Sequence, residues 1–257
     1  MILVCDVGNT NIVIGIYDNG WKHILRTETL KNENVLHYSL ILNECLWEHR
    51  INPTDIEYKS LSTVVPELKD TMLELLKNLN DSPVVIVDRN LYSKLPLKIM
   101  NPKEIGTDIV CNALASYLKF KEHLLVIDFG TALTFTVIDD QGEIIGVNIA
   151  PGIRIAIETL VQRTSQLPIV DISFPKNPIG TTTNEAIQNG VLVGYIGLIK
   201  YMIKVIKNHL DHDFVIVATG GLSSLLYPHI GDIDHVIPHL TLDGLKLAGK
   251  IYLDSKH

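Results

Sequence analysis

A short phrase occurs twice in this chain, each time directly after a run of apolar residues. Asp6-Val7-Gly8-Asn9-Thr10 follows residues 2–5, and Asp128-Phe129-Gly130-Thr131 follows residues 124–127. Each copy leads into a β-rich run, a turn and a second β-rich run, which is the pattern of a hairpin. The two copies begin about half a chain length apart. The repeat therefore predicts the same unit, a strand followed by a DxGxT turn and a hairpin, in both halves of the chain.

The residue types in both copies suit the binding of nucleotide phosphates. Glycines let backbone N–H groups approach a phosphate closely, and threonine hydroxyls can donate hydrogen bonds to its oxygens. Asp6 and Asp128 lie at strand ends, where a carboxylate can hold Mg²⁺ directly or through water. One Asp-x-Gly alone is an ordinary turn, but two copies in matching hairpins favour a phosphate clamp. The chain contains no GxxxxGK[ST] loop of the P-loop type.

Composition narrows the class of protein. A chain of 257 residues with 46% hydrophobic and 20% charged residues is typical of a soluble enzyme with one large or two ordinary domains. The net charge of −7 argues against a nucleic acid or an anionic membrane as partner. Cys5, Cys45 and Cys111 form no CxxC pair, which favours the reducing cytoplasm. Neither a signal peptide nor a membrane span is expected, since the longest apolar run, 191–202, contains Lys200.

Strand and helix patterns follow the same order in the two halves. In the first half we expect strands at 2–7, 11–17, 22–29, 59–65 and 84–88, and helices at 34–49 and 67–80, with a linking helix at 103–121. In the second half we expect strands at 124–129, 132–138, 143–149 and 214–218, and helices at 152–161, 184–209 and 241–253. This order predicts an α/β protein of two lobes, 1–113 and 114–257, each a mixed sheet flanked by helices, around a cleft. Duplicated RNase H-like lobes that open with such hairpins resemble the acetate-and-sugar-kinase, Hsp70 and actin superfamily.

A further carboxylate, Asp108, ends the phrase Asn101-Pro102-Lys103-Glu104-Ile105-Gly106-Thr107-Asp108. Pro102 is well placed to open the linking helix, so Asp108 is expected within or just past its first turns. Asp108 can simply favour the helix dipole. It can equally be a base between the lobes that takes a proton from a substrate hydroxyl. The residues alone leave both interpretations open.

Three other phrases are weaker signals. The phrase from Gly146 to Gly152 is a turn by itself, and the phrase from Gly180 to Glu185 is a helix N-cap with an acidic residue nearby. Thr219-Gly220-Gly221 follows an apolar strand, where a double glycine suits the close approach of an adenine or ribose. The ten histidines show no metal spacing. Among them, the histidines expected to be ordinary loop residues are His229, His235 and His239.

Taken together, these phrases resemble those of the type III pantothenate kinases over nearly the whole chain. The resemblance is carried by the phrases at 6–11, 101–108, 128–132, 149–152, 166–168, 180–190, 219–221 and 240–245. Their order is more specific than any single phrase. The resemblance implies ATP-dependent phosphorylation of pantothenate, the first step of coenzyme A synthesis.

The resemblance also implies roles for individual residues. Asp108 would be the general base, with Gly106, Thr107 and Asp108 at the substrate, and Asp6 would hold Mg²⁺. The expected ATP contacts are Gly8, Asn9, Thr10, Asn11, Gly130, Thr131, Thr219, Gly220 and Gly221. The family uses a monovalent cation, K⁺ or NH₄⁺, and Asp128 matches a position near it. Its members are homodimers, and Thr183 matches a residue that reaches the pantothenate site of the partner subunit.

Two positions depart from the family pattern. An arginine usually follows the catalytic aspartate, but here the residue is Ile109, and paired glycines often found near Gly146 are missing. Lys103 and Arg154 could supply the lost cation. Two alternatives therefore stay open, a kinase for another small hydroxy acid or sugar, and a non-catalytic nucleotide-binding regulator of the same fold. The intact Asp6, Asp108 and Asp128 favour catalysis, whereas Ile109 favours its loss.

Overall fold

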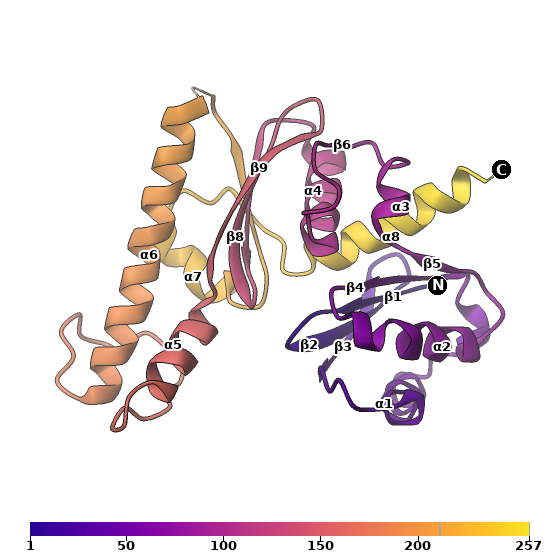
Figure 1. Cartoon of the computed structure of the whole chain (residues 1–257), viewed down its shortest axis with the longest axis horizontal. Helices are drawn as coiled ribbons and strands as arrows, with labels where there is room; N and C mark the ends of the chain where they lie inside the picture. Colours follow the sequence, from indigo (N-terminus) through magenta and orange to yellow (C-terminus); the bar gives the residue numbers. More distant parts are fainter. Residues whose placement is uncertain (211, 257) are drawn as a thin grey trace. The chain divides into compact units, whose positions relative to one another are not determined.

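The computed structural model describes residues 1–210 and 212–256. The chain folds into two compact units (Figure 1). Unit 1 contains residues 1–119 together with 240–257, and unit 2 contains residues 120–239. The expected boundary at 113/114 falls inside helix α4 (Thr107–Phe120), whereas the observed boundary follows residue 119, at the end of that helix. The last helix, expected in the second lobe, belongs to unit 1 because its apolar side chains pack there.

The sheet of unit 1 has the strand order β3-β2-β1-β4-β5. Its strands are β1 (Ile2–Val7), β2 (Asn11–Tyr17), β3 (Trp21–Glu28), β4 (Tyr58–Thr63) and β5 (Val84–Ile86). The first three strands form an antiparallel meander, and β4 and β5 then add in parallel to β1. Parallel addition requires crossover connections, and helices supply them.

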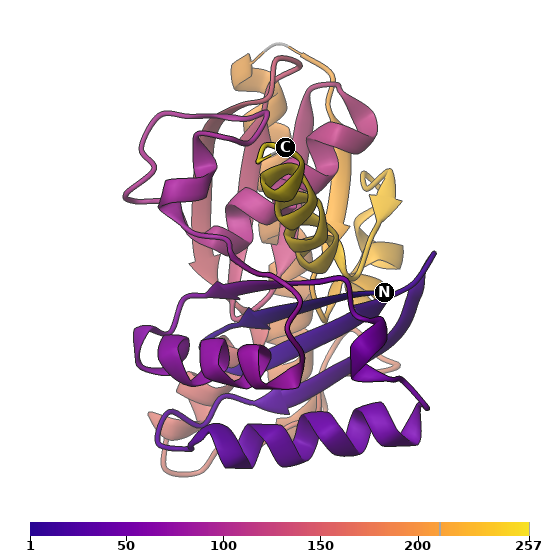
Figure 2. The same cartoon turned by 90° about the vertical axis from the view of Figure 1, so that its right-hand side faces the viewer.

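Helices cover both faces of this sheet. The helical segments of unit 1 are α1 (Val35–Glu48), α2 (Lys69–Leu79), α3 (Arg89–Tyr92), α4 and α8 (Leu240–Asp254), with single 3₁₀ turns at Pro53–Asp55 and Pro66–Leu68. Leu3, Cys5 and Val7 of β1 pack in one core with α1 and α2. Val4 packs in the other core with α4 and α8. In Figure 2 the strands of this sheet lie between α1 and the yellow C-terminal helix α8. Because side chains alternate along a strand, Asp6 lies on the same face as Val4.

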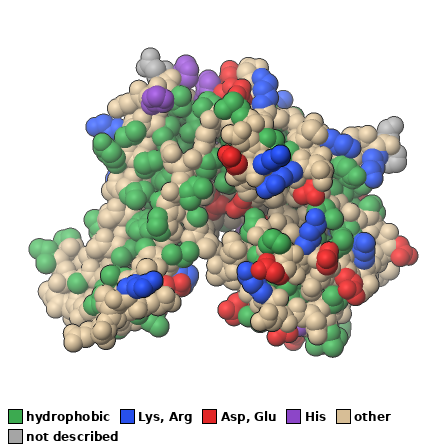
Figure 3. Space-filling view, in the orientation of Figure 1, with side chains coloured by type: hydrophobic (Ala, Val, Ile, Leu, Met, Phe, Trp, Pro, Cys, Tyr) green, Lys and Arg blue, Asp and Glu red, His purple; other side chains and the backbone are tan. Residues whose placement is uncertain are grey.

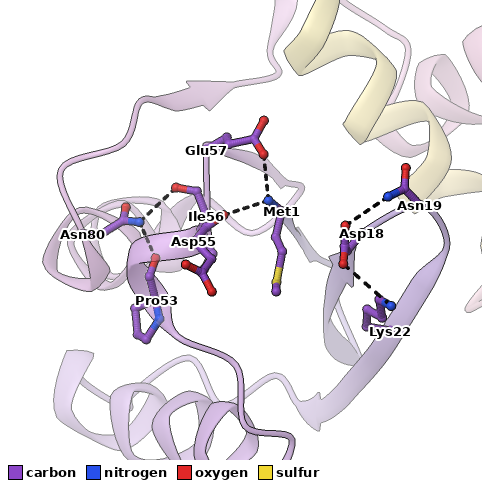
Figure 4. Close-up of polar contacts among 9 residues, drawn as sticks. All are labelled: Met1, Asp18, Asn19, Lys22, Pro53, Asp55, Ile56, Glu57 and Asn80. Atoms are coloured by element: carbon purple, nitrogen blue, oxygen red, sulfur yellow. Dashed lines mark hydrogen bonds and ion pairs between the residues drawn. The ribbon is translucent and has the colours of Figure 1, made fainter.

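Polar groups fix the loop that precedes β4 (Figure 4). The terminal ammonium of Met1 donates to the carbonyl of Asp55 at 2.7 Å and to Oε1 of Glu57 at 2.9 Å. Asn80 Nδ2 donates to the carbonyls of Pro53 and Ile56. These bonds satisfy backbone carbonyls outside the strand ladder, so the loop holds β4 beside the start of β1.

The sheet of unit 2 repeats the topology of the first. Its strands, in the order β11-β10-β7-β8-β9, are β7 (Leu124–Phe129), β8 (Ala132–Ile138), β9 (Glu143–Pro151), β10 (Val215–Thr219) and β11 (His235–Val236). Strands β7, β8 and β9 form the antiparallel meander, and β10 and β11 add in parallel. The same order of antiparallel and parallel strands in two sheets confirms the predicted duplication.

One face of this second sheet packs against α5 (Ile153–Gln162), α6 (Thr183–Leu210) and α7 (Ser223–Ile230). Leu125, Ile127 and Phe129 of β7 point into that core. By the alternation of the strand, Asp128 lies on the opposite face. Thus Asp6 and Asp128 occupy the same topological position in the two units, each facing away from the helices that follow the meander.

Helix α6 is unusually long and apolar. By length and composition alone this helix could cross a membrane, and 22% of its most apolar 18-residue stretch is buried. The apolar run 191–202 noted in the sequence lies inside this longer helix. Its uncovered residues include Val193 and Tyr201, which are 52% and 66% exposed, and Figure 3 shows hydrophobic side chains gathered over this helix.

Several local expectations need correction. Helix α4 begins at Thr107, so Pro102 lies in the preceding loop and does not open the helix. His229 lies in α7 and His235 in β11, where loops were expected. Short elements escaped the sequence patterns because a four-residue helix and two-residue strands have no measurable periodicity; they are α3, β6 (Lys98–Ile99) and β11.

Candidate phosphate-binding turns and catalytic carboxylates

The first glycine turn is closed by hydrogen bonds to its own hairpin. The backbone N–H of Gly8 donates to the carbonyl of Asn11 at 3.0 Å. Thr29 reaches back from the end of the meander, since its Oγ1 donates to the Gly8 carbonyl at 2.7 Å and its N–H to the Thr10 carbonyl at 3.0 Å. Asn9 and Thr10 are exposed at the tip. Hydrogen bonds with Asn11 and Thr29 therefore hold the base of the turn, while its tip stays accessible to a ligand.

The second glycine turn has the same position but is one residue shorter. Residues 8–11 lie between the paired residues Val7 and Ile12, whereas only residues 130–132 lie between Phe129 and Leu133. The second copy is thus DxGT, not DxGxT. The N–H of Gly130 donates to the carbonyl of Ala132 at 3.2 Å, and Gly130 and Thr131 are both exposed.

Gly152 supports this second turn, which the sequence alone did not suggest. Its N–H donates to the carbonyl of Thr131 at 3.0 Å. A β-carbon on Gly152 would collide with the carbonyls of Gly130 and Thr131. The Pro-Gly phrase before α5 is therefore more than a chain reversal, because only glycine lets the helix start this close to the turn.

Asp108 is the second residue of α4 and is held by its own backbone. Its Oδ1 accepts a hydrogen bond from the N–H of Ile109 at 2.9 Å. Burial raises the pKa of Asp108, and the backbone N–H groups of Ile109 and Asp108 oppose that shift. A β-carbon on Gly106 would collide with Oδ1 of Asp108. The glycine two residues before the carboxylate therefore leaves room for it.

Asp6 and Asp108 lie on one side of unit 1, next to Cys111. Cys111 is fully buried one helical turn after Asp108, and burial raises the pKa of its thiol well above the ordinary value. The charges of Asp6 and Asp108 both raise this pKa further. Val4 and Cys111 belong to one core, and Asp6 lies on the face of β1 that carries Val4, so Asp6 lies on the side of the sheet that is covered by α4, the helix of Asp108.

Two residues near Asp108 bear on its role. Tyr92 was not found from the sequence, and Ile109 departs from the family pattern. Tyr92 of α3 is buried and its hydroxyl donates to Oγ1 of Thr107 at 3.2 Å. Burial raises the pKa of Tyr92 to about 12, so the phenol stays protonated and orients Thr107. The side chain of Ile109 is 8% exposed, so the position of the family arginine is filled by a buried apolar group.

In unit 2, Asp128 lies against the double-glycine phrase. Thr219 is paired with Asp128 in the parallel ladder, and both lie on the face opposite the α5–α7 core. Gly220 has a φ of +88°, and a β-carbon there would collide with Oδ1 of Asp128. Ser223 Oγ donates to the Gly220 carbonyl at 2.7 Å and fixes this corner. The Oγ1 of Thr219 is buried and has no hydrogen-bond partner among the residues that the structure describes.

Thr183 is the first residue of α6 and is exposed. The expected N-cap before it is confirmed. Thr182 Oγ1 accepts from the N–H of Glu185 at 3.3 Å, and Glu185 Oε2 accepts from the N–H and hydroxyl of Thr181 at 2.9 and 2.8 Å. The cap explains Thr181 and Thr182, but the exposed hydroxyl of Thr183 has no role in it.

Comparison with known proteins agrees with this geometry. The sequence model of the type III pantothenate kinase family matches residues 2–205. Two proteins named type III pantothenate kinase, from Citrifermentans bemidjiense and Geobacter sp. strain M21, are each 35% identical over 252 residues, covering 96% of this chain and 98% of theirs.

Solved structures with a similar fold have much lower sequence identity. A Campylobacter jejuni protein described as a Baf family transcriptional activator is 18% identical with a TM-score of 0.58, covering 98% of this chain and 100% of that one. A putative 2-dehydro-3-deoxygalactonokinase from Sinorhizobium meliloti is 12% identical with a TM-score of 0.58, covering 98% and 99%. A 2-hydroxyisocaproyl-CoA dehydratase activator from Clostridium difficile, with bound ADPNP, is 11% identical with a TM-score of 0.55, covering 99% and 97%. These likenesses show the actin-like fold.

Proposed function

The chain belongs to the type III pantothenate kinase family, and on that basis we propose the role of each site residue in the reaction. The enzyme is a kinase that transfers a phosphoryl group to an alcohol. It uses ATP with a divalent metal to phosphorylate pantothenate to 4'-phosphopantothenate, the first step of coenzyme A synthesis. Phosphoryl transfer proceeds through a loose transition state, so positioning and charge neutralisation dominate catalysis.

Asp108 is the general base in this proposal, and the observation that carries it is the pair of carboxylates beside Cys111. Asp108 has a pKa raised by burial, which brings a carboxylate closer to the range useful for proton transfer. Gly106 and Thr107 precede it and contact the substrate, and Tyr92 orients Thr107. Asp108 accepts the proton of the pantothenate hydroxyl as the bond to phosphorus forms. A base in this role contributes about 10²- to 10⁴-fold to the rate.

The two glycine turns bind the phosphates. Gly8, Asn9, Thr10 and Asn11 form the first turn, and Gly130 and Thr131 form the second. Hydrogen bonds hold the base of both turns, and the tips are exposed. The N–H and hydroxyl groups at the tips are therefore available to phosphate oxygens. Asp6 supplies carboxylate oxygens, the donors that Mg²⁺ prefers, at the strand end beside the first turn. When bound there, Mg²⁺ would supply positive charge against the transferred phosphoryl group.

Asp128 and Thr219 are suited to a monovalent cation. The donor set is a carboxylate next to a buried threonine hydroxyl whose oxygen has no partner in the described part of the chain. A buried unpaired polar atom costs free energy unless a ligand or water satisfies it. A K⁺ or NH₄⁺ ion bound there would satisfy the hydroxyl oxygen of Thr219. Thr219, Gly220 and Gly221 form the adjacent adenosine contact, where the open side of Gly221 leaves room for a flat ring.

Helix α6 forms the interface of a homodimer in this proposal. Gly190, Gly194 and Gly197 have open space where side chains would be, and they follow one helical face to the exposed Tyr201. Small residues let two helices approach closely, and the exposed apolar side chains supply area to bury. The exposed Thr183 at the start of the same helix is then available to the partner's pantothenate site. An interface also accounts for the apolar character of α6 in an enzyme that we place in the cytoplasm.

The test is ATP consumption by purified protein with Mg²⁺ and K⁺ across a panel of acceptors. The panel contains pantothenate, pantoate, small hydroxy acids and sugars. We expect turnover with pantothenate and formation of a product heavier by one phosphoryl group. Turnover with a different acceptor only would replace pantothenate as substrate, and ATP binding without turnover on any acceptor would support a regulator.

A further inference from the structure

Two side chains at the end of α1 meet a third from a distant strand at one edge of unit 1. They are His23 of β3, Cys45 of α1, and His49 directly after α1. One ligand atom from each lies within 4.8 Å of the others. Within residues 1–210 and 212–256, this is the one group of three or more His, Cys, Asp or Glu side chains with that spacing. The spacing of the histidines along the sequence did not indicate this group, because His23 is 26 residues before His49.

The fold itself builds this cluster. Leu25 of β3 packs against the core that contains Leu42 and Leu46 of α1. His23 is two residues before Leu25 and lies on the same face of the strand, because side chains alternate. Cys45 and His49 are four residues apart, which places them on one side of the helix. The packing of β3 against α1 thus brings the three side chains together.

The orientation of the rings suits metal binding. Nδ1 of His49 lies 2.8 Å from the carbonyl of Cys45, so a proton on Nδ1 is donated there and Nε2 keeps its lone pair for a ligand. Metal-binding histidines commonly have such a carbonyl partner on the other nitrogen. The ring of His23 lies against that of His49, with centroids 3.7 Å apart and planes inclined by 35°.

We propose that His23, Cys45 and His49 bind one divalent cation of the zinc class, with water completing a tetrahedral site. A thiolate and two imidazoles are the donors preferred by zinc, whereas Mg²⁺ requires oxygen donors. The site joins the edge strand β3 to the end of α1, so the ion acts as a cross-link that stabilises unit 1. It lies on the α1 side of the sheet, opposite the face of Asp6 and Asp108.

The proposal does not depend on the kinase reaction. Its test uses the full chain without a histidine tag, after chelator treatment, titrated with Co²⁺ as a spectroscopic substitute for Zn²⁺ and then with Zn²⁺ against a chromophoric chelator. We expect one equivalent of Co²⁺ to give intense tetrahedral d–d bands and a sulfur-to-cobalt charge-transfer band, and we expect Zn²⁺ to displace it. The thermal midpoint should rise with Zn²⁺, because an ion that binds only the folded state stabilises it.

Variants locate the ion. His23→Gln and His49→Gln should each weaken Zn²⁺ binding by at least about tenfold to a hundredfold, and Cys45→Ser should remove the charge-transfer band. His37→Gln is the matched control, because His37 lies on α1 outside the cluster. The two histidine variants keep the test decisive if the change at buried Cys45 impairs folding. Equal affinity in wild type and both histidine variants, or octahedral Co²⁺ spectra in wild type, would overturn the proposal.

Discussion

The backbone of Gly220 approaches Asp128 so closely that a β-carbon at position 220 would collide with Oδ1 of the aspartate. Gly220 also has a φ of +88°, a conformation that costs a residue with a side chain about 1–2 kcal/mol. The carboxylate of β7 and the phrase that ends β10 are thus one structural unit. A substitution of either Gly220 or Asp128 should therefore affect the position of the other residue.

Gly220→Ala should lower both stability and activity. The strained φ should reduce the free energy of unfolding by about 1–2 kcal/mol, and the methyl group should displace Asp128 and raise KM for ATP. Gly231→Ala is the control for backbone strain, since its φ is +82° and its β-carbon would meet nothing within 4 Å. Urea denaturation and initial rates separate the two effects. Normal kinetics in Gly220→Ala would show that Asp128 tolerates displacement.

Asp108→Asn should abolish phosphorylation, with a loss of about 10²- to 10⁴-fold in kcat, because an amide cannot accept the hydroxyl proton. Its stability should change with pH in a defined direction. The folded-state pKa of Asp108 is raised, so its contribution to stability is fully present below the unfolded value of about 3.9 and is lost as pH rises through the folded pKa. The neutral amide of the variant avoids this loss. We therefore expect the thermal midpoint of the variant to exceed that of wild type at pH 7 and the difference to shrink towards pH 4. Turnover within a few-fold of wild type would exclude Asp108 as the base.

Activity should require a monovalent cation as well as Mg²⁺. Replacing K⁺ by Na⁺ or tetramethylammonium at constant ionic strength should reduce the rate. Thr219→Val is nearly isosteric and removes the buried hydroxyl, for which residues 1–210 and 212–256 supply no hydrogen-bond partner. Without K⁺ this variant should be as stable as wild type or more so, and with K⁺ it should lose the activation. Equal K⁺ activation in wild type and Thr219→Val would remove Thr219 from the cation site.

Ile109→Arg should lower KM for pantothenate with a smaller effect on kcat. A well-placed charge-assisted hydrogen bond contributes about 1.5–3 kcal/mol, which corresponds to about a ten- to hundredfold change in KM. Because Ile109 is buried, the longer side chain must extend out of the helix interface to reach the substrate. Ile109→Met is the control for side-chain length without charge. If wild type shows no turnover at saturating pantothenate and only Ile109→Arg creates it, the regulator hypothesis becomes the better one.

Mixed dimers should restore activity from two inactive variants. Asp108→Asn removes the base from one site, and Thr183→Arg damages the site to which Thr183 contributes. If sites are shared, one composite site in each heterodimer carries neither defect, so about half of the heterodimers' sites regain function. Tyr201→Arg should separate the subunits in sedimentation experiments, whereas Leu36→Arg, a similarly exposed apolar position on α1, should not. Heterodimers without activity would show that each subunit builds its own site.

The sequence was informative where a pattern repeats along a strand or helix. The two apolar strands and their glycine turns predicted both sheets, and the alternation along β1 and β7 explains why Asp6 and Asp128 take equivalent positions. The shorter second turn was already visible in the sequence, where Asn9 separates Gly8 from Thr10 but no residue separates Gly130 from Thr131, and the strand register confirms it. The cluster of His23, Cys45 and His49 escaped because the packing of β3 against α1 brings His23 to the other two residues, and the i, i+4 spacing of Cys45 and His49 does not reveal that third group.

The return of α8 to unit 1 also has a consequence for folding during synthesis. Gly244 of α8 packs so tightly on the backbone of Cys111 that no side chain fits between the helices. Unit 2, residues 120–239, is continuous and emerges from the ribosome before α8. At about 5–20 residues per second, the face of the first sheet that α4 and α8 share lacks α8 for roughly 6–24 s. The first half of the nascent chain is therefore the part that most needs a chaperone, although it is made first.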